Sequence, residues 1–347
     1  MDLYRRQQQY HAFKKTELEK KGERFEIKAP VTVAVSLGNC IAVGFGDGSI
    51  RFFRPGLANT VTQAHDGVVL CMAADGDHVL TGGDDGRFLK TSSNGVVNQI
   101  ASFGTKWVDC VAANGEQYAC SSGRDAHVWS KGKANAAVLK HISTVGGLAF
   151  DARGKRLAVS HYGGVTLWSR TERRWKSTKL IWKGLHGVVS FSPDGKYIVT
   201  AMQENALHGW RLRDKANLAM SGYPAKTKSF AWVGSTPYLV TSGANEAVCW
   251  PFDSKDGPMN RSPICIANGG EEMVTHVHPM PNKSVVFAGF RDGKVLLAEI
   301  DEIKDPCLLK DSTGAEITAI AVTESLSHVL IGDDNGHILW APLWAEE

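Results

Sequence analysis

The sequence of 347 residues contains no long apolar run. No stretch approaches the ~18 to 20 apolar residues that a helix needs to cross a bilayer. The first residues, MDLYRRQQQYHAFKK, are charged and lack the apolar core of a secretory signal. These absences argue against a membrane-spanning helix and a secretory leader, so we expect a cytoplasmic protein with no membrane partner.

Cysteine is sparse, with seven residues and no Cys-x-x-Cys pair, so neither a disulfide framework nor a zinc knuckle is expected. A large excess of one charge is also lacking. The net charge is +3, and residues 1–24 account for all of it, with seven Lys or Arg against four Asp or Glu. Because the rest of the chain is neutral in sum, we do not expect a nucleic acid as the partner.

Sequence signatures of catalysis are missing too. The Gly-rich segments 44–48 and 82–86 lack the Gly-Lys-Ser/Thr of a phosphate-binding loop, and neither opens a helix pattern. Gly and Asp clusters between apolar runs are typical of hairpin turns instead. No nucleophile-elbow sequence occurs. We therefore expect a protein without enzymatic activity and without a cofactor.

The sequence is rich in glycine, and it contains a repeat. Glycine makes up 36 of the 347 residues, above the roughly 7% average, which indicates many tight turns. One pattern recurs eight times: an apolar strand, a strand ending in small residues, an Asp, Asn or Gly turn, and a third strand. The turn markers of the eight copies are Gly48, Gly86, Asp125, Gly163, Asn205, Asn245, Gly293 and Gly336. Their spacing, near 40 residues, is that of a four-stranded propeller blade.

The fifth copy resembles the WD repeat. It reads Phe191-Ser-Pro-Asp-Gly195, then Tyr197-Ile-Val-Thr200 and Trp210, and four other copies have a tryptophan at the matching third-strand position. The resemblance covers roughly residues 25–347. It departs from the family because the dipeptide Trp-Asp occurs nowhere, and only His65 and His186 lie near the place of the family's Gly-His pair. The resemblance implies a divergent WD-repeat β-propeller, and these departures mean that the family's buried His-Ser/Thr-Asp-Trp network is not to be assumed in most blades.

The same architecture follows from burial, because a small sheet cannot cover both of its apolar faces unless it stacks on neighbours. We predict an all-β, closed propeller of four-stranded antiparallel blades over residues 25–347. Eight copies favour eight blades; seven is the alternative, because the copy near residue 274 follows a long insertion. The last copy stops at its third strand, so segment 25–28 is expected to close the ring as the outer strand of the final blade. Residues 1–24 form a charged extension whose helix pattern stops at Gly22.

His276 and His278 are the best metal candidates in the sequence. They are two residues apart on a first strand, so both imidazoles face the same side, and first strands line the axis of a propeller. Among the predicted first strands, Asp109 is the only other ionisable residue that was found, whereas a metal site needs three or four converging ligands. We therefore expect no metal, and a metal-handling or enzymatic channel is the alternative.

Two stretches depart from a plain repeat. Segment 170–183 carries six cations and one acid, and its place in the repeat is the turn and outer strand of the fourth blade. Such cations commonly protect an exposed edge strand, and Arg with Trp is also typical of interface hot spots. The second stretch is a Pro-rich loop at 251–263, and long loops often carry function.

These departures lead to the predicted function, a non-catalytic scaffold that binds a protein partner. An anion or nucleic-acid binder using segment 170–183 is the rival. The loop is similar to loops of single-domain bacterial WD-repeat proteins, some of which occur in genomic settings with metal-handling GTPases, and this resemblance implies such a GTPase as a partner. The predicted partner-binding residues are Arg170, Arg173, Arg174, Trp175, Lys176, Lys179, Trp182, Lys183, Pro251, Phe252, Pro258 and Met259.

Overall fold

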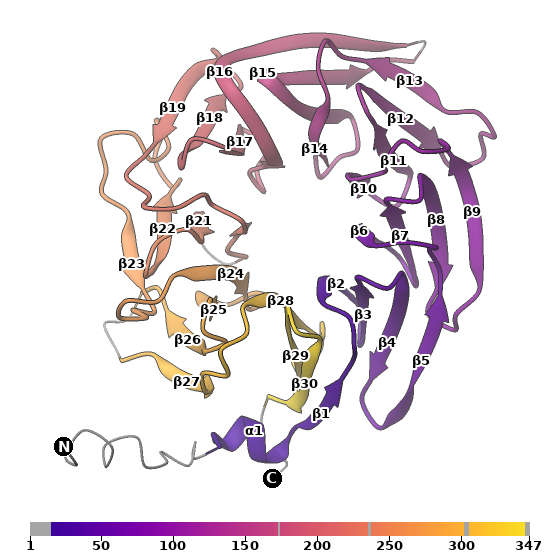
Figure 1. The fold of residues 1–347 in the computed structure, drawn as a ribbon. Coiled ribbons are helices and arrows are strands. Elements are labelled where there is room, and N and C mark those ends of the chain that lie inside the picture. The colour runs from indigo at the N-terminus through magenta and orange to yellow at the C-terminus, as the bar shows by residue number, and fades with distance from the viewer. Residues whose placement is uncertain (1–14, 173, 235–236, 302–304, 344–347) are drawn as a thin grey trace, which may run out of the picture.

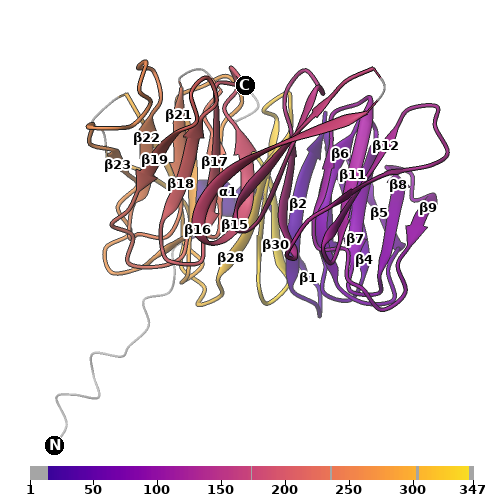
Figure 2. The ribbon, with the colours of Figure 1, turned by 90° about the horizontal axis from the view of Figure 1, so that it is seen from above.

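The computed structural model describes residues 15–172, 174–234, 237–301 and 305–343. Within these ranges the chain forms thirty strands and one short helix. The strands gather into sheets that stand as blades around a central axis (Figure 1). Seen at right angles to this view, the ring is a disc whose strands cross its thickness (Figure 2). The predicted all-β propeller is therefore confirmed.

The strands follow the order of the repeat copies. The first half of the chain contains β1 (Glu23–Glu26), β2 (Val31–Leu37), β3 (Cys40–Phe45), β4 (Ser49–Arg54), β5 (Leu57–Gln63), β6 (Val69–Asp75), β7 (His78–Gly83), β8 (Arg87–Ser92), β9 (Val97–Ser102), β10 (Val111–Ala113), β11 (Gln117–Ser122), β12 (Asp125–Ser130), β13 (Ala137–Lys140), β14 (Val145–Phe150) and β15 (Arg156–Arg170). The second half contains β16 (Trp175–Phe191), β17 (Tyr197–Met202), β18 (Leu207–Arg211), β19 (Ala216–Met220), β20 (Phe230–Trp232), β21 (Tyr238–Thr241), β22 (Ala247–Pro251), β23 (Ile264–Ile266), β24 (Val274–Pro279), β25 (Val285–Phe290), β26 (Val295–Glu299), β27 (Cys307–Lys310), β28 (Ile317–Val322), β29 (His328–Asp333) and β30 (His337–Pro342).

The second strand of most copies is the most deeply buried. All six residues of β3 and of β17 are buried, whereas the outer strands β5 and β9 have no buried residue. A strand that is covered by neighbouring sheets on both faces reads as a continuous apolar run rather than an alternating one. The core therefore lies between the blades, close to the inner and middle strands.

The blade count differs from the favoured prediction. Instead of eight separate blades there are seven antiparallel sheets among the described residues, six with four strands and one with six. The copy near residue 274 is a regular sheet, β24 to β27, so the insertion before it is not the cause. The fourth and fifth copies share one sheet because β15 and β16 are unusually long.

Each of these two long strands spans more than one strand of the repeat. The first part of β15 pairs with β14 and the second part with β16, while the end of β16 pairs with β17. Both strands contain glycines at positive φ where a turn was expected, with φ of 89° at Gly163, 131° at Gly164 and 97° at Gly184. The strand pairing continues past these bends and joins the fourth and fifth copies in one sheet. All eight copies of the repeat are therefore present, although they form seven sheets.

The two ends of the chain meet in the last sheet. Strand β1 pairs antiparallel with β30, with Phe25 opposite Ile338, and begins two residues before the predicted segment 25–28. Between this last sheet and the first there is no strand pairing. Side chains form that joint instead, because Ile27 and Phe53 pack in one buried cluster with Trp340.

Helix α1 (Glu17–Lys21) precedes β1, and Gly22, the predicted stop, is its C-cap; residues 1–14 of the predicted extension lie outside the described residues. Thr16 caps it with a capping box that includes Glu19. Leu18 is buried in the cluster that also contains Leu339, and the Thr16 hydroxyl donates to the Leu309 carbonyl at 2.5 Å. The described part of the extension is therefore attached to the last two sheets.

Candidate partner-binding groove

The predicted basic strip lies on the turn after β15 and along the first half of β16. Arg173 lies outside the described residues. Trp175 and Trp182 are half-buried. The exposed cations of the strip are Arg170, Arg174, Lys176, Lys179 and Lys183. Strand β16 pairs with β15, so the strip lies on the outer strand of the fourth copy, as predicted.

The Pro-rich loop after β22 uses its apolar side chains internally. Pro251, Phe252 and Pro258 are buried, and Met259 is half-buried. The Phe252 ring meets the Tyr197 ring edge-on, with centroids 5.2 Å apart. These apolar residues hold the loop against the neighbouring sheet, so the charged side chains of the loop are exposed and its prolines and Phe252 are not.

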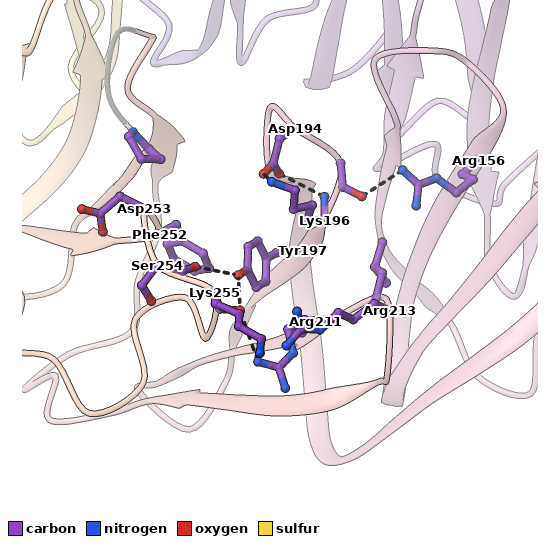
Figure 3. Close-up of a pocket in the computed structure, with 13 residues that line it drawn as sticks. Arg156, Asp194, Lys196, Tyr197, Arg211, Arg213, Phe252, Asp253, Ser254 and Lys255 are labelled. Carbon is purple, nitrogen blue, oxygen red and sulfur yellow. Dashed lines mark hydrogen bonds and ion pairs between the residues drawn. The ribbon is translucent and has the colours of Figure 1, made fainter.

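Polar contacts fix the same loop in place (Figure 3). The Tyr197 hydroxyl lies 3.1 Å from the carbonyl oxygen of Ser254 and 3.2 Å from that of Lys255. Arg211 Nη1 donates to the Lys255 carbonyl at 3.2 Å, and Arg211 also pairs with Asp256. The Lys255 ammonium is thus presented from an ordered backbone.

Four hollows adjoin one another along one face of the ring, and we call them together the basic groove. Their volumes are about 880, 530, 830 and 520 Å³. In antiparallel sheets the turns between first and second strands, and between third and fourth, lie at the same end. The groove is built mainly from such turns of the third to sixth copies. The residues that adjacent hollows share are Arg156, Asp194 and Gly195, then Ala152, Arg153 and Lys155, then Arg170, Thr171 and Glu172.

Positive charge dominates the described lining of the groove. The acidic lining residues are Glu116, Asp151, Glu172, Asp194 and Asp253. The cationic ones are Lys133, Arg153, Lys155, Arg156, Arg170, Arg174, Lys196, Arg211, Arg213 and Lys255. Ten cations against five acids leave an excess of five positive charges on this face, whereas the whole chain carries only +3.

Most acids of the groove are already engaged. Asp151 pairs with Arg156 at 2.9 Å, and Asp194 pairs with Lys196 at 2.9 Å. Burial alone would raise the pKa of Asp194, but hydrogen bonds from Ser192 and Lys196 outweigh it and lower that pKa. Six exposed cations of the lining have no ion-pair partner among the residues described: Lys133, Arg153, Lys155, Arg170, Arg174 and Lys255. They are free to meet an anionic ligand.

The far end of the basic strip belongs to a different hollow. Trp182 and Lys183 line an apolar hollow of about 450 Å³ with Tyr162, Met220 and His208. The Trp182 ring stacks on His208, with centroids 4.0 Å apart. The predicted strip is therefore divided, since Arg170, Arg174 and Trp175 line the basic groove and Trp182 and Lys183 do not.

The metal candidates do not converge. His276 and His278 both lie half-buried on the innermost strand β24. Asp109 is exposed and accepts a hydrogen bond of 2.7 Å from Ser121. Among the residues that the structure describes, no group of three or more His, Cys, Asp or Glu could hold a metal ion. Burial lowers the pKa of His276 to about 3, with a contribution from His278, and burial lowers the pKa of His278 to about 4.

One copy keeps most of the family's polar network. His65 contacts the Thr81 hydroxyl through Nε2 at 2.9 Å and Asp85 through Nδ1 at 3.0 Å. Burial lowers the pKa of His65 despite Asp85. In the fifth copy, His186 contacts Thr200 at 2.7 Å, and its ring lies 5.5 Å from that of Trp210. These two histidines are the ones that the sequence pattern singled out.

The sixth copy builds an equivalent network from a residue that the sequence pattern missed. The Tyr223 hydroxyl lies 2.6 Å from the Thr241 hydroxyl and accepts a hydrogen bond of 2.7 Å from Trp250. Burial raises the pKa of Tyr223 to about 12. A tyrosine can replace histidine here because its hydroxyl also joins the threonine to the tryptophan. The tryptophan at position 250 was the sequence feature that indicated a network in this copy.

Comparisons with known proteins agree with this geometry. The family model described as WD domain, G-beta repeat (WD40) matches residues 58–88, which include His65, Thr81 and Asp85. No curated protein matches the sequence significantly. The crystal structure of the computationally designed Ika8 protein is similar with a TM-score of 0.74 and 16% identity, over 92% of this chain and 98% of that one. The C-terminal WD40 domain of Sif2 is similar with a TM-score of 0.73 and 14% identity, over 93% and 99%.

The match of one repeat to the WD40 family model and the shared fold support a WD-repeat β-propeller. At such low identities, the two solved structures bear on the fold alone. The described residues contain no helix of the length and apolar character that crossing a bilayer requires. Propellers of the WD40 type are generally protein-interaction scaffolds. The basic groove is the candidate surface for such an interaction in this chain.

Proposed function

We propose that the protein is a non-catalytic cytoplasmic scaffold that binds a protein partner in the basic groove. The observation that carries this proposal is the row of adjoining hollows with six exposed cations that have no ion-pair partner among the described residues. A cleft lined by one sign of charge concentrates ligands of the opposite sign and speeds their association. The metal-handling GTPase implied by the resemblance is one partner of this kind to be tested.

The composition of the groove favours a protein over a nucleic acid. Half as many acids as cations line it, and the half-buried rings of Trp168 and Trp175 lie at one end. Protein interfaces combine aromatic anchors with arginine in this way. A surface for a phosphate backbone gains little from the apolar walls and is weakened by each carboxylate.

The test reverses the charge of the groove. The groove variant carries Arg153→Glu, Lys155→Glu and Arg174→Glu. In affinity purification from the source cells, we expect it to retain about a tenth or less of the native partner that the wild-type protein retains. The matched control, called the β16 control variant, carries Lys176→Glu, Lys179→Glu and Lys183→Glu. It makes the same change of charge on β16 outside the groove. Quantitative mass spectrometry of the bound proteins provides the readout.

The control variant also separates two interpretations of segment 170–183. Loss of the partner in the groove variant alone supports the proposal. Loss in the β16 variant alone places the binding surface along the edge strand and contradicts it. An unchanged set of partners in both variants, with unchanged melting temperatures, would mean that these cations only protect an exposed edge.

A further inference from the structure

We infer that the ligand of the basic groove is an extended acidic segment of the partner protein, an inference that rests on the proposed function. The four hollows adjoin in a row and are open along their length, so they fit a chain rather than a compact small molecule. The row crosses turns of four successive copies, from Lys255 in the sixth to Lys133 in the third.

Exposed cations are spaced along the groove, so that separate carboxylates of one segment can meet them. Lys255 lies at one end of the groove, Arg153 and Lys155 lie near the middle, and Arg170 and Arg174 follow toward the other end. All five are exposed, and none has an ion-pair partner in the described ranges of the chain. Glu or Asp side chains spaced along an extended segment would each reach a separate cation, with charge-assisted hydrogen bonds.

Two buried amide atoms below the third hollow provide an independent observation. Asn114 Nδ2 and Gln117 Oε1 are buried without a hydrogen-bond partner, and both residues line this hollow with Arg153 and Arg170. Unsatisfied buried polar groups are uncommon in folded proteins and call for a ligand or another explanation. The site therefore offers one donor and one acceptor in addition to its cations.

The identity of these two atoms is fixed by their neighbours. Asn114 Oδ1 accepts from the backbone N–H of Glu116 at 3.1 Å and of Gln117 at 2.9 Å, so the other terminal atom of Asn114 is the NH2 donor. Gln117 Nε2 donates to the Gly154 carbonyl at 2.6 Å, so its other terminal atom is an acceptor. A peptide backbone supplies both a carbonyl and an N–H, whereas a phosphodiester backbone has no donor for Gln117. Both atoms are fully buried in this structure, so the segment reaches them only when the side chains above them move.

The experiment titrates the full-length protein with a fluorescent Glu-rich peptide that has a Phe at one end. Its companions are the same peptide with Gln in place of Glu, and a single-stranded oligouridine of equal charge. We expect the Glu peptide to bind at least about tenfold more tightly than either companion, with an affinity that falls as salt is raised. The groove variant should weaken Glu-peptide binding about tenfold or more, and the β16 control variant less than about twofold.

Two results would overturn this inference. Tighter binding of the oligouridine, lost in the groove variant, would make the groove a nucleic-acid surface. Equal binding of the Glu peptide to the wild-type and groove-variant proteins would show that acidic segments do not bind there. If the native partner is nevertheless lost from the groove variant, the scaffold proposal stands and only the chemistry of its ligand is wrong.

Discussion

Deletion of residues 1–29 is expected to lower the free energy of unfolding by at least about 5 kcal/mol, which is comparable with the whole stability of many domains. The deletion removes β1 and leaves the edge of β30 without its partner. It also removes the buried side chains of Leu18 and Ile27, and the half-buried Phe25, whose ring lies 5.3 Å from Phe53. Denaturant unfolding measures the change.

Two shorter deletions calibrate this effect. Removal of residues 1–14 keeps every contact described above, so its stability should match that of the full chain within about 0.5 kcal/mol. Removal of residues 1–22 keeps β1 but deletes Leu18 and the bond from Thr16 to Leu309, so an intermediate loss is expected. If the 1–29 deletion unfolds at the same denaturant concentration as the full chain, β1 does not stabilise the ring.

Acidification from pH 7 toward pH 5 is expected to destabilise the protein strongly, before most of its carboxylates protonate. Burial lowers the pKa of His276 to about 3 and that of His278 to about 4, and burial lowers the pKa of His208 to about 4. The unfolded chain, with histidine pKa values near 6.5, then binds more protons than the folded chain. The folded state therefore has full histidine-linked stability above about pH 6.5 and loses it as the pH falls, by up to about 1.4 kcal/mol per pH unit for each histidine.

Residual exposure of His276 and His278 reduces this slope, so a combined loss of about 2 kcal/mol by pH 5 is a reasonable expectation for the pair. Chemical denaturation at several pH values measures it. The double variant His276→Gln and His278→Gln should show a flatter dependence between pH 6.5 and 4.5. An equally steep loss in the double variant would mean that these two histidines are not the titrating groups. The lowered pKa values of Asp85 and Asp253 act below about pH 4 and so affect a separate range.

The repeat was readable because turn and strand chemistry is local. Gly48 and Gly86 have φ of 83° and 75°, a conformation that glycine adopts readily, so such turns mark the copies in the sequence. The joining of the fourth and fifth copies could not be predicted from the sequence. A glycine such as Gly163 or Gly184 is equally compatible with a turn between two strands and with a bend inside one strand. Tyr223 was missed since its role depends on the distance from its hydroxyl to Trp250, which no local pattern specifies.

The basic groove was only partly predictable for a related reason. Arg170 and Arg174 lie close together in the chain, so a search for charge runs finds them. Arg153 and Arg213 each lie in an ordinary turn of a different copy, and Lys255 lies in the Pro-rich loop of a third. The ring brings these cations to one face. The predicted Pro-rich loop contributes to the groove through its charged residues, while its apolar residues are buried.

Site-specific photo-crosslinking in living cells tests the central claim, that this propeller binds a protein partner in its basic groove, most directly. A photoreactive residue at position 171 lies among the shared lining residues of the groove. The same residue at position 325 is the control, because Ser325 is exposed on the turn between β28 and β29, on the same face but on the opposite side of the ring. We predict that position 171 captures a protein with an acidic segment and that position 325 does not. Capture of the partner at position 325 but not at position 171 would contradict the account.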